Sequence, residues 1–170
     1  MDTFLVVASK REVRDYAGRP IPADAEQRIL EAGRISGSSQ NRQPWRFLVV
    51  ESPSLRARLA DAVYVPANVR GAALVVVIAV GGRGPTAFDA GRAAQNMMLT
   101  AWNDQIGSCP NGMPDPDAVA RLLDFEEGER PVVVLTFGYR ARSSDPQRRA
   151  AIDWIERANR KSFDEVVQRL

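Results

Sequence analysis

A polar stretch over residues 36–45 carries the densest group of side chains that could bind a ligand. It reads Ser-Gly-Ser-Ser-Gln-Asn-Arg-Gln-Pro-Trp, and nearly all of its side chains can donate a hydrogen bond. Ser and Asn at the end of a helix also compete for backbone groups and stabilise a turn. This turn, fixed at its far end by Pro44 and Trp45, could wrap a flat polar ligand, but these residues alone favour a plainer interpretation. The alternative is an ordinary helix-to-strand loop.

A second candidate is the basic cluster Lys10-Arg11-Glu12-Val13-Arg14-Asp15-Tyr16, in which three cations lie within five residues. Such a cluster near the end of an element suits a phosphate, because arginine offers a planar fork of donors and lysine a point charge. The alternative interpretation is a solvated basic patch, which is what most charge runs are.

The chain contains no histidine and a single cysteine, Cys109. This composition excludes Ser-His-Asp and Cys-His catalysis, histidine-ligated zinc and an internal disulfide, and it leaves no metal cluster. An enzyme of this composition that works near neutral pH needs another source of reactivity, and a bound cofactor is the natural candidate. We expect Cys109 itself to be a small buried hydrophobic residue.

The overall composition is that of a globular protein with one core. The chain has 170 residues, of which 45% are hydrophobic and 26% charged, with a formal charge of +2. Its basic residues are not interleaved with aromatics, and its longest apolar run, 72–80, is too short to span a bilayer. The N-terminus lacks the pattern of a signal peptide. We therefore expect a cytoplasmic protein that binds neither nucleic acid nor membranes.

Hydrophobic periodicity predicts helices separated by strands, and so a mixed α and β fold with one sheet. The expected helices cover residues 2–8, 22–35, 52–63, 88–105, 115–125 and 146–159, and the expected strands cover 47–51, 73–80 and 131–139. The helix over 88–105 carries a broad apolar stripe with small residues, which suits close packing in the core or at a dimer interface.

Two glycine-containing segments differ in what they predict. Residues 107–112, Gly-Ser-Cys-Pro-Asn-Gly, predict a tight loop whose backbone amides a ligand could approach. The Gly-Gly-Arg-Gly run at 81–84 lacks the spacing of a dinucleotide-binding fingerprint and is followed at once by Pro85. Only the first of the two is a candidate ligand site.

Motifs along the chain resemble, in the same order, those of the FMN-dependent nitroreductase family. The family's early Arg-Arg-Ser-Val-Arg-x-Phe motif resembles residues 10–16, and its Pro-Ser-x-x-Asn-x-Gln-Pro-Trp loop resembles 37–45. Its Asp-x-Gly-x-Ala-x-Gln-Asn helix resembles residues 89–96, and its Gly-x-Gly-Ser-Cys loop and Gly-Tyr strand end resemble 105–109 and 138–139. The resemblance covers nearly the whole chain up to Arg140, and then residues 160–167.

The resemblance implies an α+β fold with a central antiparallel-rich mixed sheet flanked by helices, in an intertwined homodimer with FMN at the interface. Residues 1–170 would be a single FMN-binding domain, with 141–170 a C-terminal arm that wraps the partner subunit. NADH or NADPH would be the reductant and a small nitroaromatic or quinone-like molecule the electron acceptor. The flavin would carry the chemistry, so no side chain is expected to be catalytic.

The family's cofactor contacts map onto this chain residue by residue. The phosphate would be held by cationic side chains, namely Lys10, Arg11, Arg14, Arg160 and Lys161. The polar stretch over residues 36–45, called the serine-rich loop below, would reach the flavin of the partner chain through Ser38, Ser39 and Asn41. The reactive edge of the isoalloxazine would face the backbone of Pro110, Asn111 and Gly112. Asn68 is a candidate for the pyrimidine edge.

The chain also departs from the family pattern. Glu12 stands where a phosphate-binding serine is usual, and its carboxylate would repel a phosphate unless it turns away or pairs with Arg14. Gly37 replaces a proline, and the link 81–88 is short where many relatives insert helices over the pocket. Three hypotheses follow: an FMN-dependent oxidoreductase, a non-catalytic protein that stores or senses flavin, and a scaffold that has lost the cofactor.

Overall fold

The computed structural model describes residues 1–142 and 145–170 of the chain. The chain divides into two compact units, of which unit 1 comprises residues 1–10 and 144–170 and unit 2 comprises residues 11–143. Each unit is described by itself below. In the described part of the chain, no helix has both the length and the apolar character needed to cross a lipid bilayer.

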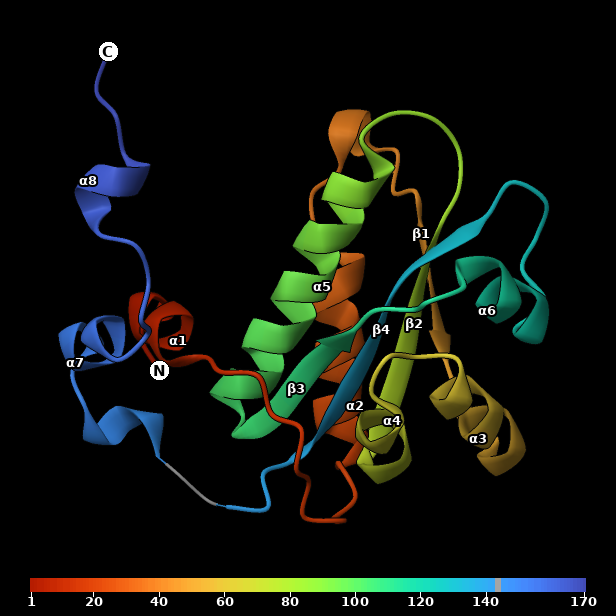
Figure 1. Ribbon diagram of the computed structural model, residues 1–170, viewed down its shortest axis with the longest axis horizontal. Helices are drawn as coiled ribbons and strands as arrows, with labels where there is room; N and C mark the ends of the chain where they lie inside the picture. Colours follow the sequence, from red (N-terminus) through yellow and green to blue (C-terminus); the bar gives the residue numbers. More distant parts are fainter. Residues whose placement is uncertain (143–144) are drawn as a thin grey trace. The chain divides into compact units, whose positions relative to one another are not determined.

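A four-stranded sheet lies at the centre of unit 2 (Figure 1). Its strands are β1 (Trp45–Val49), β2 (Leu74–Val80), β3 (Ile106–Asn111) and β4 (Arg130–Tyr139). They are arranged in the order β1-β2-β4-β3, and every pair of neighbours is antiparallel. Outside the named strands, Glu12 forms an isolated parallel bridge with Ser108. The predicted α+β class and antiparallel-rich sheet are therefore confirmed.

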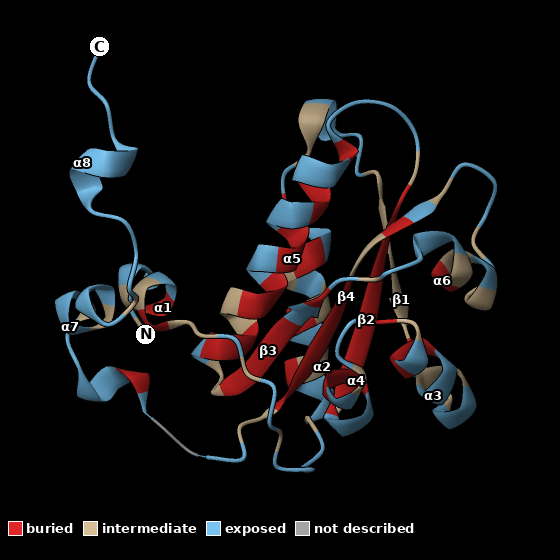
Figure 2. Cartoon of the chain, in the orientation of Figure 1, coloured by how far each residue is buried: buried red, intermediate tan, exposed pale blue. Residues whose placement is uncertain are grey.

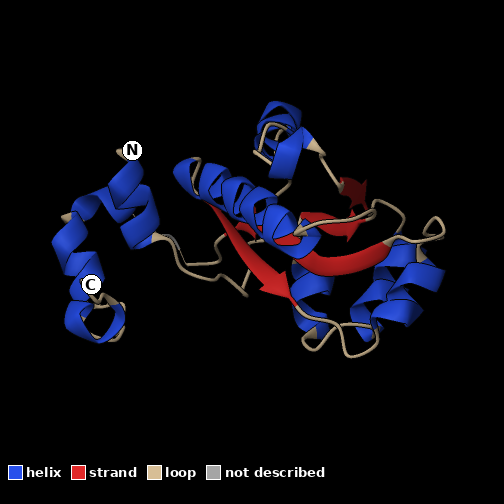
Figure 3. Ribbon diagram, turned by 90° about the horizontal axis from the view of Figure 1, so that it is seen from above, coloured by secondary structure: helices blue, strands red, loops and turns tan. Residues whose placement is uncertain are grey.

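Helices cover both faces of this sheet, as Figures 1 and 3 show from two directions. The helices of unit 2 are α2 (Ala23–Arg34), α3 (Pro53–Asp61), α4 (Pro66–Gly71), α5 (Thr86–Asn103) and α6 (Pro116–Leu122). Val76 and Ile78 of β2 pack with α2 and α5, whereas Val75 and Val77 pack with α3, α4 and α6. Successive side chains of a strand point to opposite faces, so β2 contributes to two core clusters and is buried along its whole length (Figure 2).

Local sequence signals account for the helix boundaries in unit 2. Ser52 and Asp115 cap α3 and α6 by accepting a hydrogen bond from a backbone N–H, and each is followed by a proline at the start of the helix. The two helices on the other face approach closely at Gly33 of α2, where an added Cβ would collide with Met97 of α5. Glycine is therefore required at that contact.

Unit 1 contains only short helices, α1 (Thr3–Ser9), α7 (Ala151–Glu156) and α8 (Phe163–Val166), and a 3-10 turn, η2 (Pro146–Arg148). The carboxylate of Asp2 caps α1 by accepting the N–H of Leu5 at 3.1 Å. Helix α1 packs against α7 and η2. Apolar side chains remain exposed on both helices, as Phe4, Val7, Ile152 and Ile155 show. Helix α8 is exposed throughout (Figure 2).

The prediction of a tight loop over residues 107–112 is wrong, because residues up to Asn111 belong to β3. The chain has already reversed at Gln105, which adopts a φ of 63°. Gly107 serves packing, since a Cβ there would lie 2.7 Å from the side chain of Val13. β3 is an edge strand of the named sheet, which is where a proline such as Pro110 is tolerated.

Two helix predictions are also wrong in extent. The helix expected over 52–63 ends at Asp61, and a separate helix, α4, follows it. The continuous helix expected over 146–159 is instead η2 followed by α7. The indole N–H of Trp154 donates to the carbonyl of Pro146 at 3.0 Å, which ties α7 back to that turn.

Candidate functional site

A buried network of polar side chains surrounds Asn111 at the end of β3. The amide nitrogen of Asn111 donates to the carbonyls of Cys109 and Val134 and to the hydroxyl of Thr136, at 3.0–3.1 Å. Its amide oxygen accepts a hydrogen bond from the amide nitrogen of Asn68 at 2.6 Å. Asn111 is only 3% exposed, so each of these bonds replaces water that the side chain lost on folding.

This network fixes the orientation of the Asn68 amide group. Both carbonyl partners of Asn111 can only accept, so its nitrogen must face them and its oxygen must face Asn68. Asn68 therefore donates inward through its nitrogen, to Asn111 and more weakly to the sulfur of Cys109 at 3.7 Å. Among the described residues, none donates a hydrogen bond to the Asn68 amide oxygen. The Asn68 amide oxygen is thus an acceptor of fixed orientation, in a residue that is only 1% exposed.

Gly112 and Tyr64 lie next to this amide pair. The backbone N–H of Tyr64 donates to the carbonyl of Gly112 at 3.1 Å. A Cβ added at Gly112 would lie 3.2 Å from the Tyr64 ring, so the ring lies directly against the glycine. Tyr64 is 70% exposed. Residues 110–112 and Asn68 are thus brought together as predicted, beside an accessible aromatic ring.

The basic cluster runs along the outer side of β3 and the end of β4. Val13 donates its N–H to the carbonyl of Ser108 at 3.0 Å, and Ala17 donates to Tyr139 at 2.8 Å. Between them Arg14 is exposed and forms no ion pair with any described residue, Glu12 included. Its guanidinium is therefore available to an anion.

Tyr16 anchors this basic cluster to the sheet. Its hydroxyl lies 2.9 Å from the hydroxyl of Thr136 and donates to the Thr136 carbonyl at 3.2 Å. Burial raises the pKa of the Tyr16 phenol above its ordinary value, which keeps it neutral. Because Thr136 also accepts from Asn111, one threonine connects the basic cluster with the amide pair.

Of the four remaining phosphate candidates, three belong to unit 1. Lys10 follows α1, and Arg160 and Lys161 lie between α7 and α8. Both Arg160 and Lys161 are exposed, and Arg160 donates to the carbonyl of Ala158 at 2.8 Å. Arg11 opens unit 2. That these cations act together with Arg14 on one phosphate stays a prediction.

The serine-rich loop lies beside the N-terminal part of α5, on the other face of the sheet from α4. The N–H of Ser39 donates to the carboxylate of Asp89, with N–O distances of 3.1 and 3.3 Å. The Ser38 hydroxyl accepts the N–H of Gln43 at 2.8 Å, which leaves its own proton for a ligand. Asn41 is exposed. In the described part of the chain no hydrogen bond links this loop with Asn68 or Asn111.

Sequence reasoning missed Thr136 and Tyr64. Thr136 was recognisable, because it is the one serine or threonine in the apolar strand 131–139, and a buried hydroxyl needs partners. Tyr64 had no such signal, because its contact with Gly112 joins residues far apart in the chain.

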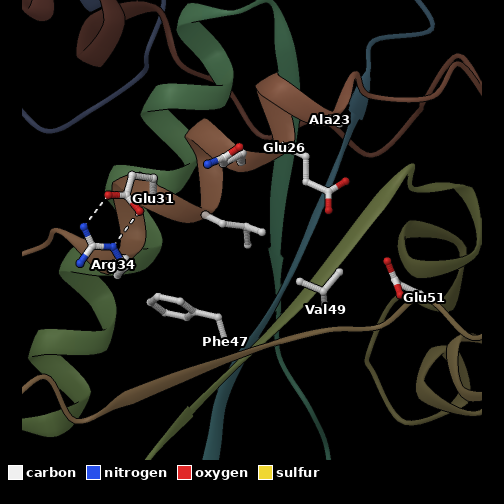
Figure 4. A pocket seen from close by; sticks show the side chains of 9 residues that line it. Ala23, Glu26, Glu31, Arg34, Phe47, Val49 and Glu51 are labelled. Atoms are coloured by element: carbon white, nitrogen blue, oxygen red, sulfur yellow. Dashed lines mark hydrogen bonds and ion pairs between the residues drawn. The ribbon is translucent and has the colours of Figure 1, made fainter.

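A cavity of about 610 Å³ lies elsewhere, between α2 and β1 (Figure 4). Its floor includes Leu30, Phe47 and Val49, and its rim carries Glu26, Glu31, Glu51 and Arg34. Arg34 is paired with Glu31 at 2.5 Å, so the rim is acidic. Such a rim repels a phosphate, and none of the predicted cofactor residues lines this cavity.

The described elements define an α+β fold in which helices cover both faces of an antiparallel sheet. The chain belongs to the nitroreductase family, whose sequence model matches residues 7–80 and 66–139. The family predicted from the motifs is therefore confirmed.

Individual relatives cover most of the chain. A protein of Methanothermobacter thermautotrophicus named for NADH dehydrogenase and NAD(P)H nitroreductase activity is 26% identical over 150 residues, which are 83% of this chain and 78% of that protein. A Desulfovibrio desulfuricans protein assigned as a nitroreductase, solved with FMN, has a TM-score of 0.82 and 24% identity and covers 100% of this chain and 97% of its own.

A third similar structure is the NADPH:FMN oxidoreductase of Vibrio harveyi, solved with NAD+. Its TM-score is 0.79 at 22% identity, over 84% of this chain and 70% of that chain. At such identities the two solved structures establish a shared fold.

Proposed function

We propose that this protein is an FMN-dependent oxidoreductase that takes reducing equivalents from NADH or NADPH and transfers them to a small acceptor. The observation that carries the proposal is the Asn68–Asn111 pair beside Gly112, in which the hydrogen bond between the two amides fixes the orientation of the Asn68 amide oxygen. Membership of the nitroreductase family and the FMN and NAD+ found in structurally similar proteins support the same assignment.

Each part of the chain has a distinct task in this proposal. FMN, when bound, accepts hydride and passes electrons onward, so no protein side chain needs to be a nucleophile or a base. Asn68 accepts a hydrogen bond from the pyrimidine edge, and the backbone of 110–112 faces the reactive edge. Arg14, together with Lys10, Arg11, Arg160 and Lys161, binds the phosphate. Tyr64 provides an exposed ring against which a flat nicotinamide or aromatic acceptor can stack.

We further propose that the protein works as a homodimer. Ser38, Ser39 and Asn41 lie on the α5 face of the sheet, whereas Asn68 lies on the α4 face. The serine-rich loop of one subunit therefore suits the flavin held by its partner better than the flavin of its own chain. The C-terminal residues 141–170 would wrap the partner. Ser143 and Ser144 of this arm lie outside the described residues.

An absorbance experiment tests the assignment. The protein is incubated with FMN, desalted, and its spectrum recorded anaerobically before and after addition of NADH or NADPH. Retained flavin bands that bleach with a nicotinamide are expected for a reductase. Retained bands that neither nucleotide bleaches would indicate a flavin-binding protein without turnover. Loss of all flavin on desalting would contradict the proposal and favour a scaffold that has lost its cofactor.

A further inference from the structure

Three polar residues on one face of α5 all contact the serine-rich loop. Asp89, Arg92 and Asn96 are three and four residues apart, the spacing that places side chains on the same face of a helix. Asp89 accepts the N–H of Ser39 at 3.1 Å, and the amide nitrogen of Asn96 donates to the hydroxyl of Ser36 at 2.8 Å. We call Asp89, Arg92 and Asn96 the α5 polar face.

Arg92 makes the middle contact, against Gly37. A Cβ added to Gly37 would lie 2.5 Å from the Arg92 guanidinium nitrogen. The guanidinium therefore occupies the space that a larger side chain would need. Gly37, which stands where the family usually has a proline, leaves this space to Arg92.

The loop that this face holds is conformationally strained. Gln40, Asn41 and Gln43 all adopt positive φ values, of 53°, 54° and 50°. Residues other than glycine adopt such angles at a cost, and they remain there only when surrounding contacts fix them. Within the loop, Ser38 accepts hydrogen bonds from the backbone N–H groups of Gln43 and Asn41, which supply part of that restraint. The α5 polar face adds contacts with Ser36, Gly37 and Ser39, at the start of the loop.

Asp89 is suited to this task by its position. It is 2% exposed and lies in the first turn of α5, where the helix dipole stabilises a negative charge. Both of its oxygens lie within 3.3 Å of the Ser39 nitrogen. Hydrogen bonds to a charged group are stronger than those between neutral groups, and burial protects this one from competition by water.

We propose that the α5 polar face is a positioning device, with Asp89 its main member, that holds residues 36–43 in the shape in which Ser38 and Asn41 meet the cofactor. The three side chains act on the loop and not on the cofactor itself. This inference rests on the proposed function only for the identity of the ligand, because the contacts with the loop exist within a single chain.

The first test compares Asp89→Ala and Asp89→Asn with Gln95→Ala, a change at an exposed residue of the same helix. Amide hydrogen exchange of residues 38–43 is measured on FMN-free protein, with the amides of β2 as an internal reference for global unfolding. Asp89→Ala is expected to raise exchange at Ser39 about tenfold and to weaken FMN binding by a similar factor, as for one lost bond to a charged group. Asp89→Asn, which keeps an acceptor, should be intermediate, and Gln95→Ala unchanged.

The two readouts separate the possible failures. Unchanged loop exchange in Asp89→Ala overturns the inference, whatever happens to FMN binding. Faster loop exchange with unchanged FMN affinity overturns the link between the loop and the cofactor. If the wild-type protein retains no FMN, the proposed function fails, and the exchange data alone still decide whether α5 holds the loop.

A second test uses the contact of Arg92 with Gly37. Gly37→Ala is expected to speed loop exchange and weaken FMN binding, because the new methyl group displaces the guanidinium. Adding Arg92→Ala removes the clash and should restore part of what Gly37→Ala lost. Strictly additive effects of the two changes would contradict a direct contact.

Discussion

Asn111 illustrates how a single buried amide determines the chemistry of its neighbour. Its nitrogen donates to Cys109, Val134 and Thr136, so its oxygen must accept from Asn68. An amide in water could rotate freely, but here the wrong orientation would set donor against donor and acceptor against acceptor, at about 1–3 kcal/mol for each unsatisfied group. The orientation of the Asn68 amide is thereby fixed as well, with its nitrogen directed at Asn111.

Arg14 provides the sharpest test of the phosphate assignment at the residue scale. Its side chain is exposed and forms no ion pair with a described residue. Arg14→Ala is therefore expected to weaken FMN binding by roughly 10- to 100-fold, the loss of a charge-assisted bond, while the Tm of FMN-free protein stays nearly unchanged. Fluorescence titration of FMN and thermal melts of the apoprotein measure the two effects.

Arg58 on α3 provides the matched control, since it is also exposed but belongs to no predicted cofactor contact. Arg58→Ala should change neither quantity beyond the small effect of one surface charge. An equal fall in apoprotein Tm and FMN affinity for Arg14→Ala would mean that Arg14 supports the fold and not the phosphate.

At the element scale, the contact of Gly107 with Val13 fixes the basic cluster against β3. A Cβ at Gly107 would lie 2.7 Å from Val13, which is too close for carbon atoms. Gly107→Ala is expected to destabilise the protein by about 1–3 kcal/mol and to lower its Tm by several degrees. Chemical denaturation measures the change.

A double variant separates this contact from a general loss of strand geometry. Val13→Ala shortens the opposing side chain, so Gly107→Ala combined with Val13→Ala should cost less than the sum of the two single changes. A coupling free energy near zero would show that Val13 is not what makes glycine necessary at this position.

The ion pair between Arg46 and Glu129 makes the stability of unit 2 dependent on pH. The Arg46 guanidinium donates to both oxygens of Glu129 and holds the pKa of that carboxyl below its ordinary value of 4.5. The folded state therefore binds the proton less readily than the unfolded state. The stabilisation is fully present above about pH 4.5 and is lost as the pH falls through the folded-state pKa.

Removing the ion pair should make the free energy of unfolding depend less on pH in the acidic range. Glu129→Gln is expected to lower stability by about 0.5–1 kcal/mol at neutral pH, because Arg46 is 40% exposed and water screens the pair, and to reduce the difference on acidification. Urea denaturation at pH 7 and below pH 4 measures both effects. Glu51→Gln, at an exposed carboxylate, serves as control; identical pH profiles for Glu129→Gln and wild type would exclude the pair as the cause.

The sequence predicted most of these elements because their signals are local. β2 is a continuous apolar run, and Pro116 and Pro53 mark helix starts together with their capping residues. β3 was missed because glycine and proline are typical of loops. Here Gly107 is needed because Val13 packs directly against it, and Pro110 is tolerated because β3 is an edge strand. Such pairings depend on tertiary contacts that no local pattern contains.

The candidate site was predictable to the same degree and for the same reason. Arg14 and Ser39 were candidates through motifs and Asn68 through the resemblance, but the bonds that Ser39 and Asn68 form involve Asp89 and Asn111, which are remote in sequence. Motifs identify the residues that would meet a ligand. They do not show which side chain holds them in place.

At the scale of the whole molecule, the C-terminal arm is the part whose role depends most on a second subunit. Residues 160–170 are exposed within the described chain, so their removal should cost the isolated subunit little stability. If they wrap a partner, truncation after Asn159 should shift the protein from dimer to monomer in sedimentation experiments and lower FMN retention. A truncated protein that stays dimeric would contradict the proposed arm.

Truncation also removes Arg160 and Lys161, so the full-length double variant Arg160→Ala with Lys161→Ala is the necessary companion. It should remain dimeric and yet bind FMN less tightly, since only the phosphate contacts are lost. Unchanged affinity for FMN in this variant would show that neither residue binds the cofactor. The role of the arm in dimer formation would then be decided by the truncation alone.

The strand order has a consequence for how the chain must fold during synthesis. β2 pairs with β1, which precedes it, and with β4, which begins only at Arg130. Until β4 has been synthesised, the seven apolar residues of β2 have no partner strand along one edge. Long-range pairing of this kind is slow, and an apolar strand with an unpaired edge is prone to self-association. We expect nascent chains that have not reached Tyr139 to be the species that chaperones recognise, with β2 as the segment they shield.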